Sequence, residues 1–375
     1  MKPVIAVLLL ATWSAGAQSE RFYLGTHTDN PLSHGIYTGT LDAQTGRLGP
    51  VRLAAPAVSP NFLALSPDGK YLYAVTETNG GSVAAFQMKT DGRLDRLNEL
   101  VAGHGVCHVS VDATGHNVFV ANYSDGSIVD FHAGTNGVLE KRTAFVAFTG
   151  SGPNPARQTK PYAHATYTDA GNRHVYACDL GSDHVWVFDF DAERGTLTPA
   201  NPPFARVSPG SGPRHLAFSP SQQFAYVNGE MGLNVTVFAR DVTSGALTER
   251  QNLSTVPLNS ESNGLATAEI FCHPNGKWLY VSNRDVAGKG RDSISVFKIG
   301  GDGLLERIQT LPANVKIPRG FNLDPSGCWL VACGQDDNRI RVFAIDPYNG
   351  KLTATDQTAL VGAPMCVVFE SPKSR

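Results

Sequence analysis

The stretch Leu65-Ser-Pro-Asp-Gly-Lys-Tyr-Leu-Tyr-Ala-Val75 contains the pattern on which the fold depends. A short apolar run enters a Pro-Asp-Gly turn, and the turn opens a second run of alternating apolar side chains. After a polar gap comes a third run, Ser82-Val-Ala-Ala-Phe86, and then a Gly-x-Leu turn. Period-two alternation between such turns is typical of short antiparallel β-strands. The stretch therefore predicts a small antiparallel sheet.

The same unit recurs along the rest of the chain. Its anchor, the apolar residue that enters the turn, stands at Leu65, Val111, Tyr167, Phe218, Cys272 and Leu323. Successive anchors are 46, 56, 51, 54 and 51 residues apart. A repeated unit of about 50 residues that holds four strands is typical of a β-propeller blade.

A seventh unit is divided between the two ends of the sequence. Val367-Val-Phe369 matches the first strand of a unit, and Phe22-Tyr-Leu-Gly-Thr-His27 matches the second. A linear solenoid has no need to match its ends, whereas a propeller closes its ring in this way. We therefore predict an all-β, seven-bladed propeller in which a C-terminal strand completes the N-terminal blade.

The first residues predict export. Lys2 precedes an apolar run over residues 4–11, and Ala15-Gly-Ala17 fits the small-x-small pattern of a signal peptidase site. We expect a signal peptide at 1–17, a single domain at 18–375, and a periplasmic or secreted protein. The net charge of -2 gives no reason to expect nucleic acid or a membrane as partner. We expect a monomer whose six cysteines are mostly free, buried thiols.

Alignment of the units places polar residues at one mouth of the channel. The position three before each anchor holds Phe62, His108, His164, His215, Glu269, Gly320 and Cys366. The position before that one includes Arg214 and Arg319. The end of the second strand holds His27, Glu77, Tyr123, Asp179, Glu230, Arg284 and Gln335. An apolar core does not need such groups, so their convergence predicts a binding or catalytic site for a small polar or anionic molecule.

Several segments resemble the lactonase-type propellers, a family that includes bacterial 6-phosphogluconolactonases and the fungal carboxy-muconate lactonizing enzyme. The most specific are Gly212-Pro-Arg-His215, Tyr226-Val-Asn-Gly-Glu230 and Tyr280-Val-Ser-Asn-Arg284. The resemblance implies the catalytic residues His164, Arg214, Glu230 and Arg284. The polar positions found by aligning the units add six substrate-binding candidates: His108, His215, Glu269, Glu77, Asp179 and Arg319. The chain departs from the family at Ala163 and Gly229, where a histidine and an asparagine are frequent.

The leading hypothesis is hydrolysis of a sugar-type lactone. Glu230 or His164 would act as general base, while Arg214 and Arg284 would hold an anionic group and polarise the carbonyl. The chemistry requires no metal or other cofactor. A divalent cation stays an alternative, because Glu77, Asp179 and Glu269 supply carboxylates that suit such an ion.

Two alternatives stay open. The first is a muconate-type lactonizing cycloisomerase, and the second is a non-catalytic binding propeller. Because phosphorylated sugar lactones are cytoplasmic, export favours an unphosphorylated lactone as substrate.

Overall fold

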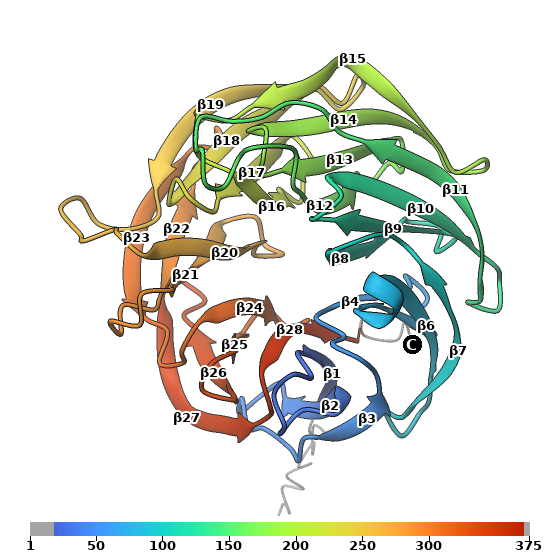
Figure 1. The fold of residues 1–375 in the computed structure, drawn as a ribbon. Helices are drawn as coiled ribbons and strands as arrows, with labels where there is room; N and C mark the ends of the chain where they lie inside the picture. The colour runs from blue at the N-terminus through green and yellow to red at the C-terminus, as the bar shows by residue number, and fades with distance from the viewer. Residues whose placement is uncertain (1–18, 371–375) are drawn as a thin grey trace, which may run out of the picture.

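The computed structural model describes residues 19–370, which form a closed ring of seven four-stranded antiparallel sheets (Figure 1). From the channel outwards, the first blade contains β28 (Pro364–Phe369), β1 (Ser19–Thr26), β2 (Gly35–Asp42) and β3 (Arg52–Pro56). The second contains β4 (Phe62–Leu65), β5 (Tyr71–Thr76), β6 (Ser82–Met88) and β7 (Leu94–Val101), with a 3-10 turn at Thr78–Gly80. The third contains β8 (Val106–Val111), β9 (Asn117–Asn122), β10 (Ser127–Ala133) and β11 (Leu139–Ala147).

The remaining four blades repeat this order. They are β12 (Ala163–Thr168), β13 (His174–Asp179), β14 (His184–Asp191) and β15 (Thr196–Arg206); then β16 (Pro213–Phe218), β17 (Phe224–Gly229), β18 (Asn234–Arg240) and β19 (Leu247–Ser254). The last two are β20 (Leu265–Cys272), β21 (Trp278–Asp285), β22 (Ser293–Ile299) and β23 (Leu305–Pro312); then β24 (Pro318–Leu323), β25 (Trp329–Gly334), β26 (Arg339–Ile345) and β27 (Leu352–Leu360). The predicted seven-bladed propeller is confirmed.

The ring closes where the sequence predicts it. Strand β28 pairs antiparallel with β1, and places Phe22 opposite Phe369 and Leu24 opposite Val367.

The predicted signal peptide lies outside the described residues. Within them, no helix is long and apolar enough to cross a membrane. Cys178, Cys333 and Cys366 are buried free thiols, whereas Cys328 is exposed between β24 and β25.

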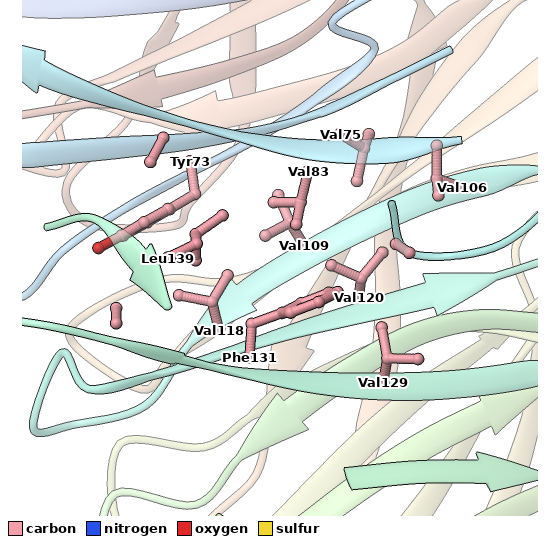
Figure 2. Packing of buried hydrophobic residues seen from close by; sticks show 13 residues of the cluster. Tyr73, Val75, Val83, Val106, Val109, Val118, Val120, Val129, Phe131 and Leu139 are labelled. Carbon is pink, nitrogen blue, oxygen red and sulfur yellow. The ribbon is translucent and has the colours of Figure 1, made fainter. Parts of the chain in front are cut away.

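Neighbouring blades pack face to face, so each sheet buries both of its surfaces. Figure 2 shows Tyr73, Val75 and Val83 of the second blade against Val109 and Val118 of the third. All five of these side chains are at most 1% exposed. Burial on both faces explains why the second strand of each unit is almost continuously apolar in the sequence.

A tyrosine in the second strand joins several blades to the next. The hydroxyl of Tyr176 donates to the carbonyl of Gly245 at 2.8 Å, and that of Tyr226 donates to Gly303 at 3.2 Å. The same hydrogen bond joins Tyr73 to Gly137 and Tyr280 to Gly350. Each glycine stands in the turn between the third and fourth strands of the following blade.

Glycine is required in these turns for two reasons. Gly303 has a φ of +79°, which side-chain-bearing residues rarely adopt. A Cβ at this position would also lie 2.4 Å from the ring of Phe224, which packs directly on the turn. The Gly-x-Leu turn of the repeat is therefore a contact between blades as well as a turn within one.

The strand register corrects one of the predicted anchors. Val111, Phe218 and Leu323 each pair with the residue seven positions later. In the fourth blade that relation holds for Thr168, which pairs with Val175, and not for the predicted anchor Tyr167. Every position inferred from Tyr167 therefore moves by one residue.

We predict that Gly303→Ala destabilises the ring more than Gly69→Ala does. Gly69 has a similar φ of +65°, but a Cβ there would meet nothing within 4 Å. Backbone strain costs about 1–3 kcal/mol in both variants. Gly303→Ala adds overpacking against Phe224, which costs about 1–3 kcal/mol more. Urea unfolding followed by circular dichroism measures both losses, and equal losses would show that the contact with Phe224 is not a constraint.

Candidate functional site

Glu230 stands at the centre of a cluster of arginines. It directly follows β17 and is 6% exposed. Its Oε1 accepts a hydrogen bond from Arg157 Nη2 at 2.7 Å. Its Oε2 lies 3.2 Å from Arg214 Nε and 3.1 Å from Arg284 Nη2. One carboxylate is thus shared by three guanidinium groups from three different parts of the chain.

The arginines determine the charge of Glu230. Burial alone would raise the pKa of its carboxyl, but Arg284 and Arg214, together with the hydrogen bond from Arg157, lower that pKa to about 2. The carboxylate is therefore ionised at neutral pH and weakly basic.

β-Bulges direct three of the site residues toward this mouth. Pro213 pairs with Gly229 and His215 with Asn228, so Arg214 is an extra residue in β16. The same shift makes His164 an extra residue in β12 and Arg319 an extra residue in β24. A bulge changes the direction of the side chain that it carries, and bulges are frequent beside active sites.

His164 is a neutral imidazole next to the cluster. Burial, followed by the charge of Arg214, lowers the pKa of His164 well below its usual value. Its Nδ1 is buried without a hydrogen-bond partner among the described residues, while its Nε2 lies 4.0 Å from Glu230 Oε2. Nε2 is therefore the ring nitrogen that faces the site.

Arg214 is held rigidly on three sides. Besides its contact with Glu230, its Nη1 donates to the carbonyl of Ala268 at 2.6 Å and lies 3.2 Å from His215 Nε2. Because a guanidinium can only donate, Nε2 of His215 is the acceptor. The proton of His215 is then on Nδ1, which donates to Glu269 Oε1 at 2.7 Å.

The cluster has an excess of positive charge. The guanidinium of Arg319 makes no hydrogen bond or ion pair to residues 19–370. Burial and the neighbouring Arg214 and Arg284 lower its pKa to about 9. A pocket of about 590 Å³ opens beside Arg284 and Arg319. Four guanidinium groups around one ionised carboxylate are suited to bind an anion or to stabilise one that forms during a reaction.

Two predicted substrate-binding residues do not join the cluster. The Asp179 carboxylate accepts hydrogen bonds from the backbone N–H groups of Tyr162 and Gly181, so it stabilises a turn. The corrected register makes Asp179 the counterpart of Gly229, one residue before the position of Glu230. Glu77 is partly exposed and its Oε1 lies 3.3 Å from His27 Nε2. We therefore remove Asp179 and Glu77 from the candidate site.

His108 and Glu269 belong to a different part of the channel. The ring of His108 packs on Phe62, with 4.3 Å between centroids, and on His215, with 5.3 Å. Both His108 and Glu269 line a cavity that extends toward the opposite mouth. His215 lies between this cavity and the cluster.

The acidic candidates for a cation site do not converge. Glu77, Asp179 and Glu269 each have the separate partners given above. Within residues 19–370, no group of three or more His, Cys, Asp or Glu side chains is placed to hold a metal ion.

Sequence reasoning missed Arg157. This residue lies in the connection between β11 and β12, which Figure 1 shows in green above the neighbouring blades. The connection contacts the next two blades, through Gln158 Nε2 to the carbonyl of Leu180 and Asn154 Nδ2 to Met231 Sδ. The 56-residue spacing between Val111 and Tyr167, the longest in the repeat, was the signal that could have directed attention to it.

Comparison with known proteins agrees with this architecture. Residues 21–369 match the family model described as a lactonase with a seven-bladed β-propeller. The chain belongs to this lactonase family. The 6-phosphogluconolactonase of Bacillus subtilis strain 168 is 34% identical over 351 residues, which cover 92% of this chain and 97% of that protein.

Two solved structures of lactonase relatives resemble the chain along most of its length. A putative 6-phosphogluconolactonase from Bacteroides fragilis has a TM-score of 0.87 and 32% identity, covering 95% of this chain and 99% of the other. The periplasmic gluconolactonase of Pseudomonas aeruginosa has a TM-score of 0.85 and 26% identity, covering 94% and 99%.

We predict that Glu230→Gln lowers stability in a pH-dependent way. Because the pKa of Glu230 is lowered from 4.5 to about 2 on folding, its ionised form stabilises the fold fully above pH 4.5 and progressively less as the pH falls toward 2. The gap between wild type and variant should be roughly 3 kcal/mol at pH 7 and should narrow below pH 4.5. Urea unfolding from pH 7 to pH 3 measures it. Glu77→Gln is the exposed control, and a gap independent of pH would contradict the ion-pair account.

Proposed function

We propose that the chain hydrolyses a sugar-type lactone at the mouth where Glu230 stands. The observation that carries this proposal is the neutral His164 beside a cluster of four arginines and one carboxylate. Lactone hydrolysis needs a base to activate water and positive groups to stabilise the oxyanion that forms. Membership of the lactonase family supports the same reaction.

His164 is the base in this proposal, and Glu230 is not. A carboxylate with a pKa of about 2 that is held by three arginines accepts a proton poorly. In this proposal the neutral His164 carries its proton on Nδ1, so that Nε2, which faces the site, takes a proton from the attacking water. The imidazolium that forms is stabilised by Glu230 Oε2, 4.0 Å away.

The arginines act on the lactone carbonyl. As the water oxygen bonds to the carbonyl carbon, negative charge develops on the carbonyl oxygen, beside Arg284 and Arg319. The bond from that carbon to the ring oxygen then breaks. His164 returns its proton to the ring oxygen, which becomes a hydroxyl group, and the product is an open-chain hydroxy acid. This acid releases a proton to solvent, and the carboxylate that remains is matched to the arginines. Glu230 holds Arg157, Arg214 and Arg284 in place throughout.

The proposed substrate is an unphosphorylated aldonolactone. The signal peptide predicted at 1–17 would place the chain outside the cytoplasm, where phosphorylated sugar lactones are not formed. One structural neighbour is named as a periplasmic gluconolactonase, which is consistent with such a substrate. The excess of arginines is compatible with a phosphorylated and with an unphosphorylated lactone, because the oxyanion and the product carboxylate need positive partners even when the substrate carries no phosphate.

We predict that Glu230→Gln and Arg214→Ala each lower kcat/KM for glucono-δ-lactone at least about 100-fold, as is common when a charge that acts on the transition state is removed. Arg250→Ala, on the outer face of β19, is the matched control and should retain wild-type activity. A pH-stat assay with glucono-δ-lactone, its 6-phosphate and a muconate distinguishes the substrates. Unchanged rates in both site variants would overturn the catalytic assignment. No turnover of any of the three compounds by the wild type would support a non-catalytic propeller, and turnover of the muconate alone would support the cycloisomerase.

The export prediction has its own measurement. Expression of the full chain in a bacterium should yield a periplasmic protein whose intact mass corresponds to a chain that begins at Gln18. A single substitution in the apolar run, Leu9→Arg, should prevent cleavage and retain the chain in the cytoplasm. A wild-type chain that keeps residues 1–17 in the cytoplasm would contradict the prediction, and with it the choice of substrate.

A further inference from the structure

The channel contains a second cavity on the side away from Glu230. It has a volume of about 400 Å³ and is lined by the later residues of the innermost strands, down to Val111, Phe218 and Cys272. The strand starts face Glu230, since Pro213 at the start of β16 pairs with Gly229 at the end of β17. The two sites therefore occupy opposite halves of one channel, with His215 between them.

Aromatic rings form much of the wall of this cavity. Phe62, Tyr167, Phe218, Phe271 and Phe321 all line it. These residues come from five of the seven blades, and Phe218 and Phe321 also pack into the apolar clusters between blades.

Glu269 supplies the charge in this cavity. Among the described lining residues it is the one carboxylate, and none is a lysine or an arginine. Burial lowers the pKa of His108, the histidine among the described wall residues, well below its usual value, so His108 adds no positive charge at neutral pH. The wall therefore combines aromatic faces with a single acidic group.

One oxygen of Glu269 is available to a ligand. Its Oε1 accepts hydrogen bonds from His215 Nδ1 at 2.7 Å and from the backbone N–H of Ile270 at 3.1 Å. Its Oε2 has no hydrogen bond or ion pair to residues 19–370. Burial raises the pKa of Glu269 to about 7, although the charges of Arg214 and Arg319 act to lower it.

We propose that this half of the channel binds a small organic ammonium ion with an apolar body. The ammonium group would bind Glu269 Oε2, and the aromatic rings would contact the apolar body and the face of the cation. Aromatic faces attract cations, and the attraction is strongest where water is excluded. A neutral alcohol of the same shape can donate a hydrogen bond to Oε2 but brings no positive charge, and an anionic ligand is repelled, so both should bind less tightly. This site is independent of the lactonase proposal, because none of its ligand-contacting groups belongs to the arginine cluster.

Isothermal titration calorimetry on the mature protein tests the proposal with two ligands of matched shape. At pH 8, above the pKa of Glu269, 2-phenylethylammonium should bind at least tenfold more tightly than 2-phenylethanol. In Glu269→Gln the two ligands should bind with equal affinity, because the difference depends on the carboxylate. Equal affinities in the wild type, or no binding of the ammonium ion, would overturn the proposal.

A second variant locates the ligand without altering Glu269. Ala64 in β4 is partly exposed and lines the cavity, beside the apolar cluster between the second and third blades. Ala64→Phe should fill the cavity and abolish binding of both ligands, with circular dichroism confirming the fold. Unchanged ammonium binding in this variant would place the cation elsewhere on the molecule and overturn the proposal.

Discussion

The structure depends on the burial of both faces of every sheet. A single blade exposes two apolar surfaces, and each becomes stable only against the next blade. The hydrogen bond from a second-strand tyrosine to a turn glycine fixes the distance and tilt between neighbours. Tyr226 and Gly303 are one such pair. Because these contacts hold the ring rigid, the innermost strands can carry polar groups at the axis without loss of the fold.

The charged groups at the channel axis depend on this rigid ring. Bringing Arg214, Arg284 and Arg319 together within a buried site is unfavourable, since like charges repel and each has lost water. Glu230 offsets part of this cost, and the carbonyl of Ala268 fixes Arg214 further. Arg319 has no ion pair to residues 19–370, so part of the positive charge is left for the anion of the proposed reaction to balance. Burial, together with the same positive field, keeps His164 neutral, so in the proposed mechanism one arrangement of charges sets up both the base and the groups that stabilise the oxyanion.

Much of this was predictable from the sequence, but the direction of individual side chains was not. The repeat predicted the seven blades and the closing strand, and the family resemblance implied His164, Arg214, Glu230 and Arg284 as catalytic residues. One misplaced anchor, Tyr167 for Thr168, made Asp179 look equivalent to Glu230. The bulges that align His164 with Arg214 are extra residues, which a fixed offset from an anchor cannot detect. Arg157 lies between blades, outside the repeat altogether.

The strand that closes the ring also fixes the order in which the molecule can be completed. Residues 364–369 form the innermost strand of the blade that begins at residue 19. A ribosome makes β1 early, and this strand then waits for its partner until almost the whole chain has been synthesised. Until that moment the growing polypeptide has an open edge at β1 and an unfilled gap in the circle. Closure of the ring therefore waits for this last strand, and a chain that lacks residues 364–369 would remain an incomplete circle.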